Sequence, residues 1–272
     1  MPALSADGRG EATPCPLLQL KDISKSFGSI RALVSVDLQV LPGEVVALVG
    51  DNGAGKSTLI KIISGALEPD SGEILIGGSR VSLTTPQAAM AAGVATVYQD
   101  LALCDNLDVV ANLFLGRERR LRPRPVLRRF LARAQMAAEA RGVLDQLAIT
   151  LPSLRAAVGT LSGGQRQAIA VGRALLWGSK AVLFDEPTAA LGVQQTSTVY
   201  SIVRQLRARG IAVVVVSHDL VDMFRVADQI AVLRQGRLAG LFRPDDTTPD
   251  AVASAINFGS LAGVPGWKDA AP

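Results

Sequence analysis

The sequence has little cysteine and little histidine: Cys15 and Cys104 are its only cysteines, and His218 is its only histidine. The two cysteines lie far apart without metal-ligand spacing, which argues against a disulfide framework and favours a reducing compartment. Long apolar runs are missing too, because the longest, such as IAVVVV at 211–216, are far shorter than the roughly 20 residues that span a bilayer. The N-terminal MPALSADGRGEATPCP has no continuous apolar core of a secretory signal. We therefore expect no disulfide scaffold and no membrane-spanning segment in this chain.

Positive charge is present but concentrated in one segment. The formal net charge is +4, from 28 Lys and Arg against 24 Asp and Glu, and many of the arginines lie within residues 117–141. A local basic segment is compatible with nucleic acid, with an anionic membrane surface, or with a solvated helix face. The sequence leaves these three open. The remaining composition, 49% hydrophobic and 19% charged, is that of an ordinary folded protein.

Apolar runs of strand length alternate with helical patterns along most of the chain. The runs that predict buried strands are EVVALV (44–49), GVATVY (93–98), KAVLF (180–184) and IAVVVV (211–216). Helical patterns separate them, among them TLIKIISGAL (58–67) and TSTVYSIVRQLRARG (196–210). Buried strands that alternate with helices predict a mainly parallel sheet in an α/β fold.

Two further patterns interrupt this alternation. LVSVDLQV (33–40) alternates apolar and polar residues, which predicts a half-buried antiparallel strand, and QIAVLRQGRLAGLF (229–242) is typical of a hairpin. Between Tyr98 and Leu161 the strand signal disappears, and helices broken around Pro123 and Pro125 are expected instead. We therefore predict a mixed, mainly parallel sheet with an N-terminal antiparallel β subdomain and an inserted α-helical subdomain. The expected bounds are a flexible tail at 1–16, a folded unit at 17–258 with the helical subdomain at about 100–165, and a C-terminal tail at 259–272.

GDNGAGKST at 50–58 matches the phosphate-loop pattern G-x-x-x-x-G-K-[ST] between a buried strand and a helix. Its glycines let backbone amides curl around phosphate oxygens, and the lysine adds a charge for the β and γ phosphates. The serine supplies a hydroxyl to magnesium. The expected nucleotide-binding residues are Gly50, Asp51, Asn52, Gly53, Ala54, Gly55, Lys56, Ser57 and Thr58. This pattern predicts a P-loop NTPase core.

AVLFDEP at 181–187 ends a buried strand in two acidic residues. Asp185 and Glu186 should emerge at the carboxyl edge of the sheet, where open α/β sheets bind ligands. Asp185 can hold magnesium, and Glu186 can polarise an attacking water. Together with the phosphate loop, this pair predicts nucleotide hydrolysis.

A second glycine-rich helix start occurs in LSGGQ at 161–165. Ser162 and Gln165 have the spacing of a capping box, which by itself does not account for Gly163 and Gly164 in the first turn. A helix start with unobstructed amides suits a closely approaching anion. Because one nucleotide is not easily wrapped by both loops of one chain, we expect the second loop to serve a nucleotide held by another copy.

The order of these motifs resembles the ATP-binding cassette (ABC) ATPases, specifically the nucleotide-binding subunits of ABC transporters, over residues 18–242. GDNGAGKST looks like the Walker A loop, VYQD (97–100) like the Q-loop, LSGGQ like the signature, VLFDEP (182–187) like Walker B, and VSHD (216–219) like the switch segment. The amino-acid sequences of the motifs are most similar to those in cassettes of simple-sugar importers of the ribose and fructose type.

The resemblance implies a head-to-tail homodimer with shared ATP sites, in which Ser162, Gly163, Gly164 and Gln165 face the nucleotide of the partner subunit. It implies that Glu186 is the general base, that His218 contacts the γ phosphate, and that Lys56 and Gln99 take part in catalysis. Phe27 occupies the place of the aromatic residue that stacks on adenine. The implied cofactors are ATP and Mg²⁺, with Ser57, Gln99 and Asp185 as the magnesium ligands. One departure is Gly192, which stands in AALG where the family has an aspartate.

The resemblance also implies partners that this chain does not contain. These are integral membrane permease subunits and a periplasmic solute-binding protein, with the chain peripheral on the cytoplasmic face of the inner membrane and powering import of a monosaccharide. No nucleic acid is expected as a partner. The alternatives are a soluble ABC ATPase that acts on nucleic acid or the ribosome, and an exporter subunit. The arginine-rich residues 117–133 face either lipid headgroups or solvent.

Overall fold

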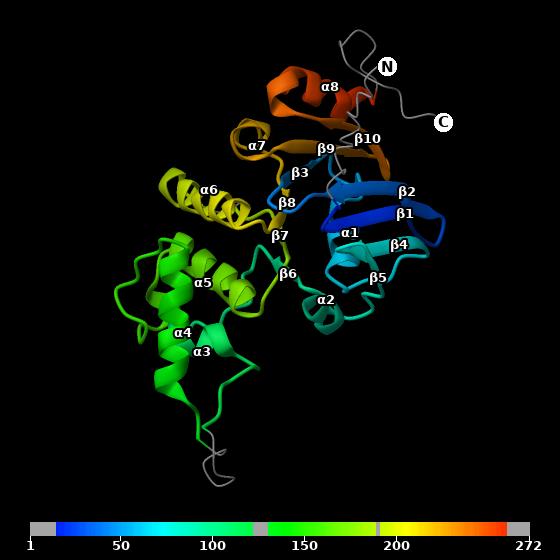
Figure 1. Cartoon of the computed structure of the whole chain (residues 1–272). Coiled ribbons are helices and arrows are strands. Elements are labelled where there is room, and N and C mark those ends of the chain that lie inside the picture. The colour runs from blue at the N-terminus through cyan, green and yellow to red at the C-terminus, as the bar shows by residue number, and fades with distance from the viewer. Residues whose placement is uncertain (1–14, 122–129, 189–190, 260–272) are drawn as a thin grey trace, which may run out of the picture.

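A six-stranded sheet forms the centre of the protein, in the order β10-β9-β3-β8-β7-β6. The computed structural model describes residues 15–121, 130–188 and 191–259 (Figure 1). The strands are β3 (Val45–Val49), β6 (Val94–Val97), β7 (Ala181–Asp185), β8 (Ala212–Val216), β9 (Gln229–Arg234) and β10 (Arg237–Phe242). All neighbours pair in parallel except β9 and β10, which form an antiparallel hairpin. The predicted mainly parallel sheet and the predicted hairpin are confirmed.

A separate antiparallel sheet of four strands has the order β2-β1-β4-β5. Its strands are β1 (Leu18–Phe27), β2 (Ile30–Val40), β4 (Ser71–Ile76) and β5 (Ser79–Val81). The predicted alternation holds from Val36 to Val40, but on the other side of Ser35 the buried residue is Leu33 and not Val34. Ser35 has a φ of 46°, so the strand is irregular there and the side-chain alternation changes phase.

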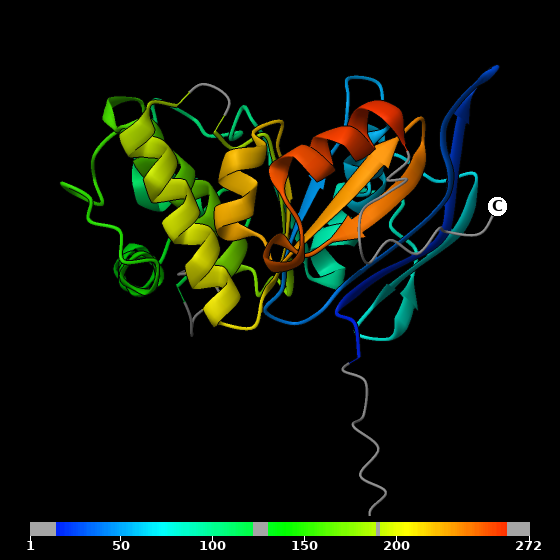
Figure 2. The same cartoon turned by 90° about the horizontal axis from the view of Figure 1, so that it is seen from above.

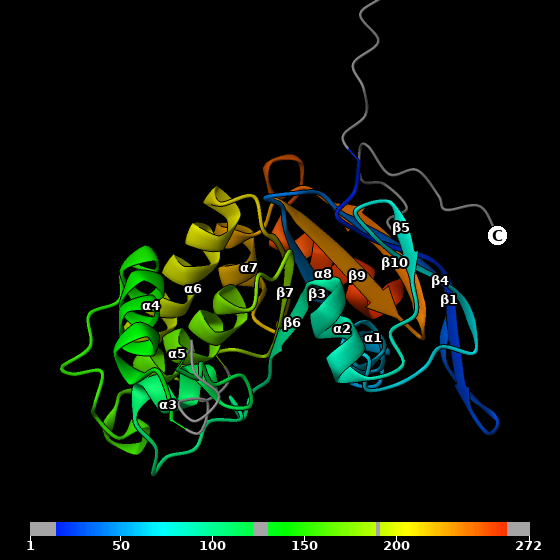
Figure 3. The same cartoon turned by 60° about the horizontal axis from the view of Figure 1, so that its bottom comes forward.

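Alternate residues of the central strands face two different cores. Val46 and Leu48 pack into a core shared with the antiparallel sheet and with α1 (Lys56–Ile63). Val45 and Val49 pack into the opposite core with helices on the other face of the sheet. Those helices are α5 (Gly163–Leu176), α6 (Val193–Ala208), α7 (Leu220–Val226) and α8 (Pro249–Phe258). Figures 2 and 3 show α6, α7 and α8 on one side of this sheet, with α1 and α2 (Pro86–Ala92) on the other. Helices on both faces explain why these strands are apolar throughout.

A helical subdomain is inserted between β6 and β7. A 3₁₀ turn outside this subdomain, η3 (Pro244–Asp246), follows β10. The subdomain itself contains α3 (Val109–Phe114), α4 (Arg133–Gln146) and the 3₁₀ turn η2 (Val158–Thr160). Its core joins α3 and α4 to one side of α5 through Ile169, whereas Ala168 and Val171 of α5 face the sheet. Helix α5 therefore bridges the subdomain and the central sheet (Figure 1).

Two predictions concern residues that lie wholly or mostly outside the described ranges. The breaks expected around Pro123 and Pro125 lie outside them, as do residues 1–14 of the tail expected at 1–16 and residues 260–272 of the tail expected at 259–272. Within the described ranges, the longest and most apolar helices still fall short of what crossing a membrane requires.

Candidate functional site

The phosphate loop follows β3, and strands β2 and β9 pack closely against one side of it. Gly50 has a φ of 151°, and a Cβ there would lie 2.1 Å from the carbonyl oxygen of Leu233. Gly55 has a φ of 108°, and a Cβ there would lie 2.6 Å from the carbonyl oxygen of Ala32. At Gly53, by contrast, a Cβ would meet no atom within 4 Å in the part of the chain that the structure describes. The loop thus needs glycine where β2 and β9 press on it, and its other side is open to a ligand.

Lys56 begins α1, and its side chain folds back over the loop. Its Nζ donates to the carbonyl oxygens of Gly50 at 2.6 Å and Asp51 at 2.9 Å. The lysine is only 8% exposed, and burial lowers its pKa, although the nearby carboxylates of Glu186, Asp51 and Asp185 oppose that shift. The amine is therefore held at the mouth of the loop, where a phosphate can replace its carbonyl partners.

Asp185 is the last residue of β7, and Glu186 follows it directly. Burial raises the pKa of the Asp185 carboxyl, and the neighbouring Glu186 carboxylate raises it further, while Lys61 and Lys56 lower it. Glu186 has a φ of 49°, and its N–H donates to the carbonyl oxygen of Val216 at 3.1 Å. This left-handed conformation is uncommon for a non-glycine residue and is typical of functional sites.

His218 follows β8, the strand next to β7. Its Nδ1 lies 3.9 Å from Oε1 of Glu186, with the imidazole 72% exposed and the carboxylate 36% exposed. The segment is held by its neighbours, because the hydroxyl of the buried Ser217 accepts from the N–H of Asp219, and Asp219 in turn caps α7. The imidazole is therefore presented to solvent beside Glu186 from an anchored turn.

The predicted magnesium ligands form a suitable donor set. Ser57 is exposed on the first turn of α1, Asp185 ends β7, and Gln99 follows β6. A hydroxyl, a carboxylate and an amide oxygen are hard oxygen donors, and Mg²⁺ is usually held by one or two carboxylates together with substrate phosphates. The residues present thus fit magnesium bound with a nucleotide.

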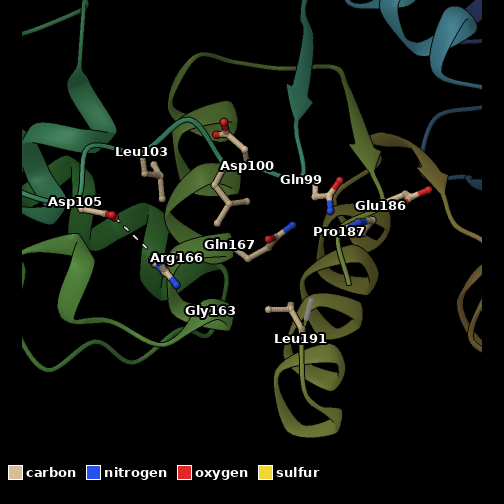
Figure 4. Close-up of a pocket in the computed structure, with 11 residues that line it drawn as sticks. Gln99, Asp100, Leu103, Asp105, Gly163, Arg166, Gln167, Glu186, Pro187 and Leu191 are labelled. Carbon is tan, nitrogen blue, oxygen red and sulfur yellow. Dashed lines mark ion pairs between the residues drawn. The ribbon is translucent and has the colours of Figure 1, made fainter. Parts of the chain in front are cut away.

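Gln99 does not stand alone at the sheet edge. A pocket of about 320 Å³ brings it together with Glu186 of the Walker B segment and Gly163 of the signature (Figure 4). Lys56 and Ser57 are not among the lining residues. In Figure 4 the side chain of Gln167 points toward Gln99 across this pocket. Three of the predicted motifs therefore share one cavity within a single subunit.

The predicted capping box at the start of α5 is present. The Ser162 hydroxyl accepts from the N–H of Gln165 at 3.3 Å, and Oε1 of Gln165 accepts from the N–H of Ser162 at 3.1 Å. The box uses those two amides, which leaves the N–H groups of Gly163 and Gly164 in the first turn for another acceptor. Ser162 is exposed, so a ligand can approach this helix end from solvent.

The two signature glycines also lie against residues in or just before a neighbouring helix, a contact that the sequence does not predict. A Cβ at Gly163 would lie 2.7 Å from Cδ2 of Leu191, and one at Gly164 would lie 3.4 Å from Cβ of Thr198. Both neighbours belong to α6 or to the residues just before it. The contact at Gly163 is with the end of a flexible leucine side chain and that at Gly164 is an ordinary van der Waals contact, so packing against α6 does not by itself require glycine at either position.

Phe27 lies at the end of β1, and Gly192 lies at the start of α6. Phe27 is 50% exposed, with Nζ of Lys25 5.9 Å from its ring centroid. The same hairpin reaches the phosphate loop, because Ala32 of β2 packs behind Gly55. Gly192 is the N-cap residue of α6 and makes no side-chain cap.

Three further residues belong to the surroundings of the site and were not predicted. Lys61 lies four residues after Ser57 on α1 and lowers the pKa of Asp185, a relationship that the one-turn spacing could have suggested. Gln167 is buried, and its Nε2 has no hydrogen-bond partner among the described residues. Arg173 contacts residues 101–102, about 70 positions earlier, and no local pattern signals that contact.

Comparison with known proteins agrees with this site. A family model described as "ABC transporter" matches residues 33–189. The xylose/arabinose import ATP-binding protein XylG of Sulfolobus acidocaldarius is 41% identical, over 91% of this chain and 96% of that protein. The fructose import ATP-binding protein FrcA of Rhizobium meliloti is 46% identical, over 88% and 93%. A ribose import ATP-binding protein of Burkholderia pseudomallei is 42% identical over 85% of this chain but only 44% of its own length.

Solved structures show the same architecture. A nucleotide-free ATP-binding cassette from an ABC transporter superposes with a TM-score of 0.72 at 26% identity, covering 84% of this chain and 91% of that one. A dimeric bacterial ABC transporter cassette superposes with a TM-score of 0.67 at 25% identity, covering 84% and 98%. The fold and the site define a P-loop ATPase of the cassette type. The chain belongs to the ABC transporter family, as an ATP-binding protein of the kind that hydrolyses ATP to power transport.

Proposed function

We propose that this chain binds ATP together with magnesium and hydrolyses it to power import of a monosaccharide through separate membrane subunits. One observation carries the catalytic part: the phosphate loop, the Asp185–Glu186 pair and His218 all follow the carboxyl ends of the neighbouring strands β3, β7 and β8. Parallel strands place such residues at one edge of the sheet, where α/β proteins bind ligands. The importer part rests on the relatives, which are named as xylose/arabinose, fructose and ribose import ATP-binding proteins.

Each residue of the site has a distinct task in this proposal. The loop amides and Lys56 hold the β and γ phosphates, while Phe27 stacks on the adenine. Ser57, Asp185 and Gln99 hold magnesium, which when bound neutralises charge that develops on the phosphate oxygens.

Glu186 orients the attacking water and accepts its proton. His218 contacts the γ phosphate from the same side, since its imidazole lies beside Glu186. Positioning and electrostatic stabilisation supply most of the catalysis in phosphoryl transfer, so the anchored turns around Glu186 and His218 matter as much as the side chains.

The active form in this proposal is a head-to-tail homodimer. Ser162, Gly163 and Gly164 of one subunit meet the γ phosphate held by Lys56 of the other. Two features support this arrangement: the exposed helix start at Ser162 and the first-turn amides that the capping box leaves over. A related cassette has also been solved as a dimer.

The full transport system contains proteins besides this chain. We infer permease subunits in the membrane and a periplasmic solute-binding protein, with this chain bound to the cytoplasmic face. The relatives' names support an import system for sugars of this size. The solute enters through the partners, because none of the residues assigned above is placed to recognise it.

Isolation of the tagged chain from native membranes tests the proposal. We expect a multispan membrane protein to co-purify, and vesicles that contain the complex to take up labelled xylose, fructose or ribose when ATP and the solute-binding protein are present. The same complex with Glu186→Gln should bind ATP and take up no sugar. Salt-sensitive binding to RNA or DNA without any membrane partner would instead support a soluble ATPase, and outward movement of solute would support an exporter.

A further inference from the structure

Arg173 of α5 joins the signature helix to the segment that follows Gln99. Its Nη1 donates to the carbonyl oxygen of Ala102 at 3.1 Å, and its Nη2 donates to that of Leu101 at 3.2 Å. One guanidinium group thus binds two consecutive peptides from a helix that is remote in sequence. A planar fork of donors suits this task, because both bonds form without any change in the side-chain rotamer.

The peptides that Arg173 binds are strained. Leu101 has a φ of 27° and Ala102 a φ of 46°, and neither residue is glycine. Such conformations persist only where the surroundings impose them. The other bonds of Leu101 and Ala102 are local: the N–H of Leu101 donates to the carbonyl oxygen of Tyr98 at 3.0 Å, and the N–H of Ala102 donates to Oδ1 of Asp100 at 2.9 Å. From outside the segment, Arg173 anchors Leu101 and Ala102, and Asn112 of α3 anchors Cys104.

This segment controls the place of Gln99. The bond from Leu101 to Tyr98 closes a four-residue turn, and Gln99 is its second residue. Because Arg173 fixes the carbonyl groups at the end of that turn, it also fixes the direction in which the turn presents the Gln99 side chain.

Arg173 is itself held in place. Its guanidinium lies 5.6 Å from the ring centroid of Trp177, the C-cap residue of α5, and the guanidinium of Arg117 lies 4.8 Å from the same centroid. Burial lowers the pKa of the Arg173 guanidinium, as expected for a charge that is largely removed from water. A charge in this setting keeps its hydrogen bonds, because leaving them unmade is costly.

We infer that Arg173 is a positioning residue, which holds Gln99 at the nucleotide site and couples it to movement of the signature helix. The inference rests on the proposed role of Gln99 as a magnesium and γ-phosphate contact. Ser162 and Gly163 begin the same helix that carries Arg173. A displacement of α5 when the signature engages a nucleotide is therefore transmitted to residues 101–102, and from there to Gln99.

The test compares Arg173→Lys with Arg117→Gln in the full-length chain. Arg173→Lys keeps the positive charge but cannot bind both carbonyl groups, whereas Arg117→Gln removes the other cation from Trp177 and leaves Leu101 and Ala102 untouched. We expect Arg173→Lys to speed hydrogen exchange of the amides in residues 98–104 by about tenfold. We expect it to raise the Mg²⁺ concentration for half-maximal binding of a fluorescent ATP analogue by about tenfold, while magnesium-free binding stays within about twofold. Arg117→Gln should change neither quantity.

The outcomes separate this inference from the proposed function. Loss of magnesium dependence in Gln99→Ala, together with unchanged exchange and unchanged magnesium dependence in Arg173→Lys, would overturn the inference alone. Full ATP hydrolysis by Gln99→Ala would overturn the proposed role of Gln99 and the inference with it. If Arg173→Lys fails to fold, Trp177→Phe takes its place, because it makes the ring beside the Arg173 guanidinium smaller. The inference then requires that Trp177→Phe speed hydrogen exchange in residues 98–104 and raise the Mg²⁺ concentration for half-maximal binding.

Discussion

Nδ1 of His218 lies 3.9 Å from Oε1 of Glu186, although the two residues are more than 30 positions apart in the chain. Their strands explain the proximity, because β7 and β8 pair in parallel and Asp185 stands opposite Val216. The N–H of Glu186 donates to the carbonyl oxygen of that same Val216. The pairing of β7 with β8 therefore places the Glu186 carboxylate beside the His218 imidazole. It also fixes the position of Glu186, the base of the proposed reaction, relative to His218.

Glu186→Gln should separate nucleotide binding from hydrolysis. The amide keeps the shape of the side chain but cannot accept a proton, so ATP turnover should fall by at least about a hundredfold. ATP binding should persist, and size-exclusion chromatography with light scattering should show a dimer that accumulates with ATP. Glu68→Gln makes the same chemical change at an exposed glutamate and should leave turnover intact. Normal turnover by Glu186→Gln would remove the base assignment.

Mixed subunits should reveal whether the sites are shared. Lys56→Ala removes the phosphate lysine and Ser162→Arg blocks the signature, so each homodimer should be nearly inactive. A mixed dimer keeps one site in which both halves are intact. An equal mixture should recover up to about one quarter of the wild-type rate, because half of the dimers are mixed and each has one of two sites. A mixture no more active than either variant alone would argue against sites built by two subunits.

Asp185→Asn should stabilise the protein while it abolishes magnesium-dependent hydrolysis. Burial raises the pKa of this carboxyl, so the folded state binds its proton more tightly than the unfolded state does. By linkage, the folded state is favoured at low pH and loses stability as pH rises through that raised pKa. At pH 7 the wild-type protein bears the cost of a partly buried charge, and removal of the charge relieves that cost.

Thermal unfolding at two pH values measures this effect. Solvent screens this partly buried charge, so the gain should be below about 1 kcal/mol and the Tm at pH 7 should rise by less than roughly 4 °C. The gain should shrink below the ordinary pKa of aspartate, where the wild-type carboxyl is protonated in both states. Asp246→Asn, at an exposed position, should show no such difference. If the Tm of Asp185→Asn at pH 7 is lower than that of the wild-type protein, the Asp185 carboxylate stabilises the folded state and the prediction is wrong.

The sequence predicted the central strands well, because strands buried on both faces are apolar at every position. The regions expected at 93–98 and 180–184 differ from β6 and β7 by at most one residue at each end. The short helices α2 and α8 were overlooked. Both begin with a threonine cap followed by proline, at Thr85 and Thr248, which is a helix-start signal that the apolar periodicity alone does not contain.

In the candidate site, too, some features can be predicted from the sequence and others cannot. The order of motifs predicts Lys56, Asp185 and Glu186 as site residues, because each motif carries its chemistry in consecutive residues. Contacts between distant segments could not be read from the sequence. The packing of Gly164 against α6 and the reach of Arg173 to residues 101–102 depend on where the tertiary fold places α5.

Gly192→Asp should stabilise α6 without inactivating the enzyme. Gly192 has the extended backbone of an N-cap, with φ −74° and ψ 164°, but it has no side chain to accept from the first-turn amides. A Cβ at this position would meet no atom of the described residues within 4 Å, so an aspartate fits among them. The α6 first turn also contains no acidic residue, and a carboxylate there would complement the helix dipole.

The expected gain in unfolding free energy is a few tenths to about 1 kcal/mol, which corresponds to a Tm increase of roughly 1–4 °C. Gly192→Ala is the matched control, because it adds the Cβ without a cap and should lower the Tm or leave it unchanged. ATP turnover should stay within about twofold of wild type in both variants, since neither alters a residue of the hydrolytic centre. Equal Tm values for the aspartate and alanine variants would show that α6 gains nothing from a cap. A large drop in turnover for Gly192→Asp alone would mean that this helix start meets the partner subunit in a geometry that only glycine permits.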